Sequence, residues 1–134
     1  MDTNIDRFLA SHDHYLADIR KVYSGGDVAD YLAWLLPGFS GSFARAGMDR
    51  SEPYDIGGSI EGMTESAASI PGLRSEIIGR EARRSSGNEI LVRYEKRIYS
   101  YDEPVSFAMV VESWRQVNGS WRLNRESIEV GRPV

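Results

Sequence analysis

His12 and Glu112 are the side chains of this 134-residue sequence that are best suited to transferring a proton. His12 lies in a stripe of apolar residues spaced three and four apart over residues 5–23, which predicts the buried face of an amphipathic helix. A polar side chain on such a face needs a partner, and an imidazole beside a carboxylate can act as an acid or a base near neutral pH. The alternative is a structural histidine bonded to a backbone carbonyl group.

The position of Glu112 follows from a predicted β-hairpin. Asn118–Gly119 lies between two runs of β-branched and aromatic residues, which predicts a two-residue turn. Val117 then pairs with Ser120, and counting back along both strands places Glu112 opposite Arg125 on one face of the sheet. Opposite charges on a dry face indicate a functional site, whereas on the outer face they form a solvated charge ladder. The residues alone leave both interpretations open.

The elements that must position these side chains change type along the chain. Helical spacing comes first, and alternation of apolar and polar residues dominates the second half. Predicted helices cover residues 5–23, 28–36 and 60–70, and predicted strands cover 39–45, 77–84, 89–100, 105–117 and 120–130. Helices followed by an antiparallel meander indicate an α+β fold, in which two to three N-terminal helices pack on one face of a strongly curved antiparallel sheet. We expect one domain over residues 1–134.

Composition excludes several classes of site. The chain has no cysteine and two histidines, so we expect no disulfide and no metal centre. His12 and His14 are two apart on a helix and point to nearly opposite sides, so they cannot chelate together. The net charge of −4 disfavours nucleic acid as a partner. The polar, acidic start and the lack of a long apolar run predict a cytoplasmic protein that binds no membrane.

Arginines gather on one predicted hairpin and alternate with glutamates. This pattern is typical of a salt-bridged outer surface. The arginines are Arg80, Arg83, Arg84, Arg93 and Arg97.

The turn and its flanking tryptophans, Trp114-Arg-Gln-Val-Asn118-Gly119-Ser-Trp121, resemble the W-x3-[DN]-G-x-W hairpin of SnoaL-like proteins and of the calcium/calmodulin-dependent kinase association domain. Gly26-Asp27 between the first two helices and the order of elements over residues 3–130 match the same layout. The chain therefore resembles the nuclear transport factor 2-like superfamily. That resemblance implies a cone-shaped pocket between the first helix and the concave sheet face, and a homodimer formed through the sheet.

The resemblance also implies where the pocket residues lie. It carries an inward-pointing role onto Glu112, and it suggests that Tyr94 or Lys96 of the neighbouring strand faces inward as well. In ketosteroid isomerase, a member of the superfamily, a tyrosine and an aspartate do the chemistry. Ile19 and Phe43 stand at those places here, so that activity is not expected. Tyr15 or Tyr54 can replace the tyrosine, although the spacing does not require it.

The sequence leads to one main functional hypothesis and two alternatives. The main hypothesis is a cofactor-free protein that binds a small apolar or weakly acidic molecule and isomerises, dehydrates or cyclises it by proton transfer. His12 and Glu112 would be the catalytic pair, and the ligand-binding residues would be Tyr94, Lys96, Arg125, Trp34, Trp114 and Tyr54. One alternative is a non-catalytic homo-oligomerisation or protein-association module. The other is that the polar groups are structural and no ligand exists.

Overall fold

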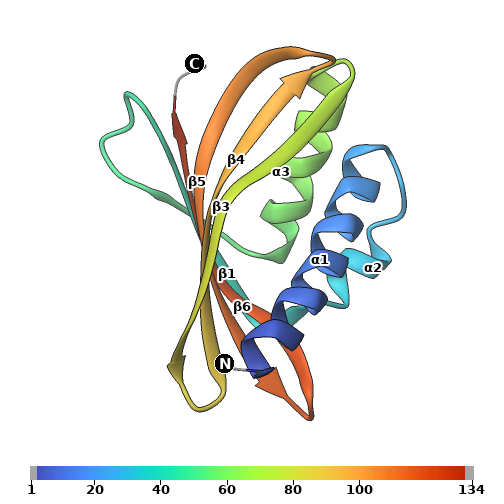
Figure 1. The fold of residues 1–134 in the computed structure, drawn as a ribbon. Helices are drawn as coiled ribbons and strands as arrows, with labels where there is room; N and C mark the ends of the chain where they lie inside the picture. The colour runs from blue at the N-terminus through green and yellow to red at the C-terminus, as the bar shows by residue number, and fades with distance from the viewer. Residues whose placement is uncertain (1–2, 132–134) are drawn as a thin grey trace.

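The computed structural model describes residues 3–131, which form three helices and a six-stranded sheet (Figure 1). The helices lie on one side of the sheet, whose long strands bend around them. The elements in chain order are α1 (Thr3–Tyr23), α2 (Ala29–Leu32), β1 (Leu35–Arg45), β2 (Glu52–Tyr54), α3 (Ile56–Ser69), β3 (Leu73–Ser86), β4 (Glu89–Ser100), β5 (Glu103–Val117) and β6 (Ser120–Gly131). The α+β architecture predicted from the sequence is confirmed.

The sheet is mixed rather than wholly antiparallel. Its strand order is β2-β1-β6-β5-β4-β3, and the predicted antiparallel meander accounts for β3 to β6. β1, however, pairs with β6 in parallel, so the expectation of a purely antiparallel sheet is wrong at this strand. The residues near β1 in the sequence do not fix its direction relative to β6, which lies far along the chain. The sheet is open, with β2 and β3 at its edges.

The first helix is built as its spacing predicts. Phe8, Tyr15, Leu16, Ile19 and Val22 are buried against the sheet, and they make up most of the helical part of the core. The helix ends where Gly25 adopts a positive φ of 86°, a conformation that glycine reaches without steric cost. Among residues 3–131, no helix is long and apolar enough to cross a bilayer.

The second helix is much shorter than predicted. It covers only Ala29–Leu32, and the chain is already extended at Leu35. Pro37 accounts for the last predicted residue, because a proline disfavours the helical conformation of the residue before it, which is Leu36. The backbone N–H of Leu123 also bonds to the carbonyl oxygen of Trp34 at 2.7 Å, which attaches this segment to β6.

Two bulges change which residues face the helices. The β5–β6 register runs from Ser113–Arg125 to Trp114–Leu123, so Asn124 is an extra residue in β6. The β3–β4 register likewise runs from Ile78–Glu95 to Glu81–Arg93, with an extra residue in β3 beside Gly79. Each bulge reverses the alternation of the strand beyond it. As a result Glu126 and Arg80 point inward, although simple alternation would have turned them outward.

Candidate functional site

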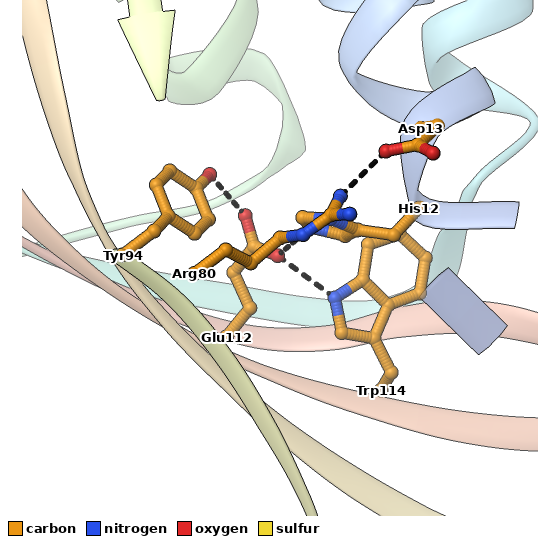
Figure 2. Close-up of polar contacts among 6 residues, drawn as sticks. All are labelled: His12, Asp13, Arg80, Tyr94, Glu112 and Trp114. Atoms are coloured by element: carbon orange, nitrogen blue, oxygen red, sulfur yellow. Dashed lines mark hydrogen bonds and ion pairs between the residues drawn. The ribbon is translucent and has the colours of Figure 1, made fainter. Parts of the chain in front are cut away.

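Glu112 on β5 lies at the centre of a cluster of polar side chains on the concave face of the sheet (Figure 2). Oε1 accepts hydrogen bonds from His12 Nε2 at 2.7 Å and from Trp114 Nε1 at 2.9 Å. Oε2 accepts one from the Tyr94 hydroxyl at 2.6 Å. Three elements, α1, β4 and β5, therefore deliver donors to one carboxylate.

The far side of the His12 ring faces Arg80. The guanidinium Nη1 of Arg80 lies 3.2 Å from His12 Nδ1 and 2.6 Å from Asp13 Oδ1 (Figure 2). A guanidinium group can only donate, so Nδ1 must accept. The imidazole therefore carries its proton on Nε2, where it donates to Glu112. The result is a chain of contacts that runs from Asp13 at the surface through Arg80 and His12 to the buried carboxylate.

Aromatic rings close this cluster off. The His12 ring lies 5.6 Å from Phe8, 5.7 Å from Tyr15 and 5.7 Å from Trp114, measured between ring centroids. His12 and Glu112 are both 0% exposed. Sequence analysis correctly brings these two residues together, but their role as a catalytic pair stays a prediction, because no solvent reaches either side chain.

The surroundings of Glu112 keep it ionised. Burial acts to raise its pKa, but the neighbouring His12 and the hydrogen bonds from His12, Tyr94 and Trp114 outweigh burial, so the pKa is lowered from its ordinary value. Burial and the nearby carboxylates raise the pKa of Tyr94 well above its ordinary value, so this hydroxyl keeps its proton and remains a donor.

A second carboxyl group, Glu126, lies next to Glu112 across the β5–β6 pair. The Tyr54 hydroxyl donates to Glu126 Oε1 at 2.6 Å, and Gly41 of β1 lies between them in the sheet. A Cβ on Gly41 would overlap the Tyr54 ring, so the glycine gives the ring room to cross β1 and reach Glu126. The residues Val92, Glu112, Glu126, Gly41 and Tyr54 thus form one row across the sheet.

Glu126 differs from Glu112 in its charge state. Burial and the negative charge of Glu112 raise the pKa of Glu126 to about 7, while the Tyr54 hydrogen bond and the Lys96 ammonium act in the other direction. Two neighbouring carboxyl groups with pKa values pushed apart are a common arrangement for acid–base chemistry.

Lys96 and Trp34 border the cluster. Lys96 is half-buried on the concave side, and its Nζ donates to the Tyr23 hydroxyl at 3.0 Å. Trp34 donates from Nε1 to Asp18 at 2.8 Å, and its ring centroid is 6.0 Å from that of Trp114. The resemblance implied that Tyr94 or Lys96 faces inward, and both do, as does Trp114.

Arg125 does not lie where the sequence analysis placed it. The bulge at Asn124 pairs Arg125 with Ser113 and leaves it exposed on the outer face, whereas Glu112 pairs with Glu126. The predicted Glu112–Arg125 cross-strand pair is wrong, because a bulge breaks the alternation on which the count relied.

Two shallow hollows on the molecule are lined by residues other than His12 and Glu112. One, of about 330 Å³, is lined mainly by outer-face residues such as Val111, Ser113 and Arg125. The other, of about 450 Å³, lies beside the end of α1 near Arg20 and Asp27. Between the helices and the concave face, the rings of Phe8 and Tyr15 pack against Trp114, with ring centroids 5.6 and 4.8 Å apart.

Sequence reasoning missed Arg80 and Glu126. Arg80 was assigned to the outer surface together with Arg93 and Arg97. Those two arginines do form surface ion pairs with glutamates, at 3.1 and 3.2 Å. The signal for Arg80 was Gly79, because an isolated glycine inside a strand often marks a bulge. No comparable signal marks the bulge before Glu126.

Comparisons with known proteins identify the fold and nothing narrower. No family model matches the chain, and no curated protein matches it. A candidate scytalone dehydratase from Novosphingobium aromaticivorans is similar, with a TM-score of 0.71, 14% identity and coverage of 99% of this chain and 89% of that one. A nuclear transport factor 2-like protein from Pseudomonas aeruginosa has a TM-score of 0.69, 18% identity and coverage of 92% and 97%.

A third similar structure is named as an association domain rather than as an enzyme. It is a candidate calcium/calmodulin-dependent protein kinase type II association domain from Thiobacillus denitrificans, with a TM-score of 0.65, 12% identity and coverage of 93% of both chains. Identities this low establish shared architecture, and a shared fold does not establish shared function. The chain therefore has the nuclear transport factor 2-like, cystatin-like fold that the tryptophan-flanked hairpin led us to expect.

Proposed function

We propose that this protein binds a small apolar or weakly acidic molecule against the concave face of the sheet and transfers a proton to or from it without a cofactor. The observation that carries the proposal is the placement of two adjacent carboxyl groups, Glu112 and Glu126, on that face. Burying carboxyl groups is unfavourable, so a fold that keeps two of them side by side, with donors fitted to each, supports a chemical role. Isomerisation, dehydration and cyclisation are the reaction classes that proton transfer serves.

The remaining concave-face residues fit a binding role in this proposal. Tyr94, Trp114 and Trp34 supply apolar walls with polar tips, and Lys96 supplies a positive charge that can orient a polar group of the ligand. Two of the similar structures carry a dehydratase name, which is compatible with this class of chemistry.

Ligand binding can be tested without knowing the ligand. Native mass spectrometry of freshly purified protein, compared with the denatured mass, is expected to reveal a bound small molecule. Nile red, a neutral apolar dye, is expected to bind saturably with an increase in fluorescence. Folded protein with neither a bound mass nor saturable dye binding would contradict the proposal.

A matched pair of variants locates the binding face. Ala108 is 6% exposed on the concave side, whereas Val111 is 42% exposed on the outer side of the same strand. Ala108→Leu is expected to weaken dye binding at least about tenfold, because added carbon atoms occupy the space that a ligand needs. Val111→Leu is expected to leave binding unchanged. Circular dichroism checks that both variants are folded.

The alternative of an association module rests on a different surface. Met109 and Val111 are exposed apolar residues on the outer face of β5. They support a homodimer formed through the sheet, which is compatible with ligand binding on the opposite face.

A further inference from the structure

Glu112 and His12 are poorly placed to exchange a proton with a ligand. Glu112 accepts three hydrogen bonds, and both side chains are 0% exposed. The Nε2 atom of His12 bonds to Glu112, and its other nitrogen faces the Arg80 guanidinium. Any proton transfer at this pair would break contacts that hold the core together, so Glu112 behaves as a fixed anion.

Glu126 offers what Glu112 lacks. It is half-buried rather than sealed, and within residues 3–131 its carboxyl group is bonded through Oε1 by Tyr54 alone. Oε2 is therefore left to meet a ligand. Two local features place this carboxyl group: the bulge at Asn124 turns Glu126 inward, and Gly41 makes room for the Tyr54 ring.

The groups that face Glu126 come from several elements. Tyr15 of α1 and Tyr31 of α2 have pKa values raised by burial first and by Glu126 second, so both face it as neutral phenols. β4 contributes Lys96 and Tyr94, β5 contributes Glu112, and β2 contributes Tyr54. The two glutamates of α3, Glu61 and Glu65, are exposed. Glu112 is thus the buried negative neighbour and Lys96 the positive one.

We propose that Glu126, held by Tyr54, is the catalytic group that exchanges a proton with the ligand, while Glu112 stays a fixed anion on the neighbouring strand. This inference rests on the proposed function above. As a base, the Glu126 carboxylate removes a proton from a carbon atom next to a carbonyl group. As an acid, the carboxyl group returns that proton to another atom of the ligand in an isomerisation, or to a departing hydroxyl group in a dehydration, which releases water.

The same arrangement narrows the class of ligand. A carboxylate ligand beside Glu126 would meet the negative charge of Glu112, which is buried and cannot be neutralised by solvent. A neutral apolar molecule with a carbonyl or hydroxyl group meets no such penalty. We therefore favour neutral ligands over weakly acidic ones.

NMR titration of the glutamate side-chain carboxyl carbons tests the assignment directly. One resonance is expected to titrate with a midpoint near the pKa of about 7, and to disappear in Glu126→Gln. Glu129→Gln, which removes an exposed carboxyl group of the same strand, is expected to leave it unchanged.

Two further variants are expected to move the midpoint in opposite directions. Glu112→Gln removes the negative neighbour and lowers the midpoint of Glu126. Tyr54→Phe removes a hydrogen bond to the Glu126 carboxylate and raises the midpoint. If Glu112→Gln fails to fold, the direction in which Tyr54→Phe moves the Glu126 midpoint is the test. A midpoint near 4.5 in the wild-type protein, or one that does not respond to Tyr54→Phe, overturns the inference.

Access of small molecules to Glu126 is a separate requirement. A water-soluble carbodiimide with glycine ethyl ester converts a reachable protonated carboxyl group into an amide, which peptide mass spectrometry locates. At neutral pH we expect Glu126 to be labelled and Glu112 to remain unlabelled. Labelling of Glu112 but not Glu126 overturns the assignment.

The outcomes separate this inference from the proposed function. A protein that binds Nile red or carries a bound molecule, yet shows an ordinary Glu126 midpoint, overturns the assignment alone. A protein with the expected Glu126 titration that binds no molecule overturns the proposed function.

Discussion

Glu112 and Glu126 are chemically identical side chains on adjacent strands, and their environments make them opposite in behaviour. Three donors hold Glu112 as an anion, and that anion then disfavours a second charge on Glu126. The pKa of Glu112 is lowered with the help of hydrogen bonds to its carboxylate, whereas the pKa of Glu126 is raised by burial beside a like charge. A reactive group can therefore be created beside an inert one of the same type.

This contrast predicts how stability depends on pH. The pKa of Glu126 is raised from 4.5 to about 7 on folding, so the folded state holds its proton more tightly than the unfolded state. That contribution is fully present below about pH 4.5 and is lost as the pH rises through about 7. We expect Glu126 to remove up to about 3 kcal/mol of unfolding free energy over this range.

Urea denaturation at several pH values measures the effect. Glu126→Gln is expected to reduce the fall of the unfolding free energy with rising pH, because an amide does not ionise. Glu129→Gln, an exposed control on the same strand, is expected to retain the wild-type decline. A decline that persists unchanged in Glu126→Gln would contradict the assignment of the raised pKa.

At the scale of elements, two bulges decide which side chains the strands present. Ordinary alternation placed Glu112 and Trp114 on one face of the hairpin, and the family resemblance implied that Glu112 points inward. Both residues lie on the inner face, together with Tyr94. Alternation could not predict Glu126 or Arg80, because each lies beyond an extra residue that reverses the alternation.

The same limitation applies to the helices and to the pairing of distant strands. The spacing of apolar residues was enough to predict α1 and the bounds of β4, since local pattern determines both. The parallel pairing of β1 with β6 depends on contacts between residues far apart in the chain, which a local pattern does not record. The inner site was therefore predictable where strands are regular and unpredictable where they are not.

The bulge beside Gly79 gives a prediction at this scale. Gly79 has a φ of 66°, and a Cβ added there meets nothing within 4 Å, so only the backbone conformation opposes a larger residue. Gly79→Ala is expected to destabilise the fold by about 1 kcal/mol. Gly62→Ala in α3, where an added Cβ also meets nothing, is expected to stabilise it by about 0.5–1 kcal/mol. Thermal unfolding measures both, and a change of the same sign in the two variants would contradict this explanation.

At the scale of the whole molecule, the two faces of the sheet differ in the side chains that they present. The inner face holds the carboxyl groups, and the outer face exposes Met109 at 39% and Val111 at 42%. An inner site and an outer interface can then operate independently on the two sides of β5.

Sedimentation equilibrium tests the predicted homodimer. Wild-type protein is expected to be dimeric, and Val111→Lys is expected to weaken the dimer at least about tenfold, because a charge is costly in a dry interface. Val117→Lys, at an apolar residue of similar exposure near the end of the same strand, is the control and is expected to remain dimeric. A monomeric wild-type protein would rule out association through this face.

The position of β6 has a consequence for how the chain is made on the ribosome. β6 is the last strand of the sequence, yet it lies inside the sheet, between β5 and β1. β3, β4 and β5 can pair as soon as they emerge, whereas β1 and β2 reach the rest of the sheet only through β6. A nascent chain therefore carries Gly41 and Tyr54 unpaired with the meander until β6 joins the two parts, and Glu126 arrives on that strand. The candidate site is complete only after β6 has been synthesised, so shortened chains that lack β6 lack the site as well.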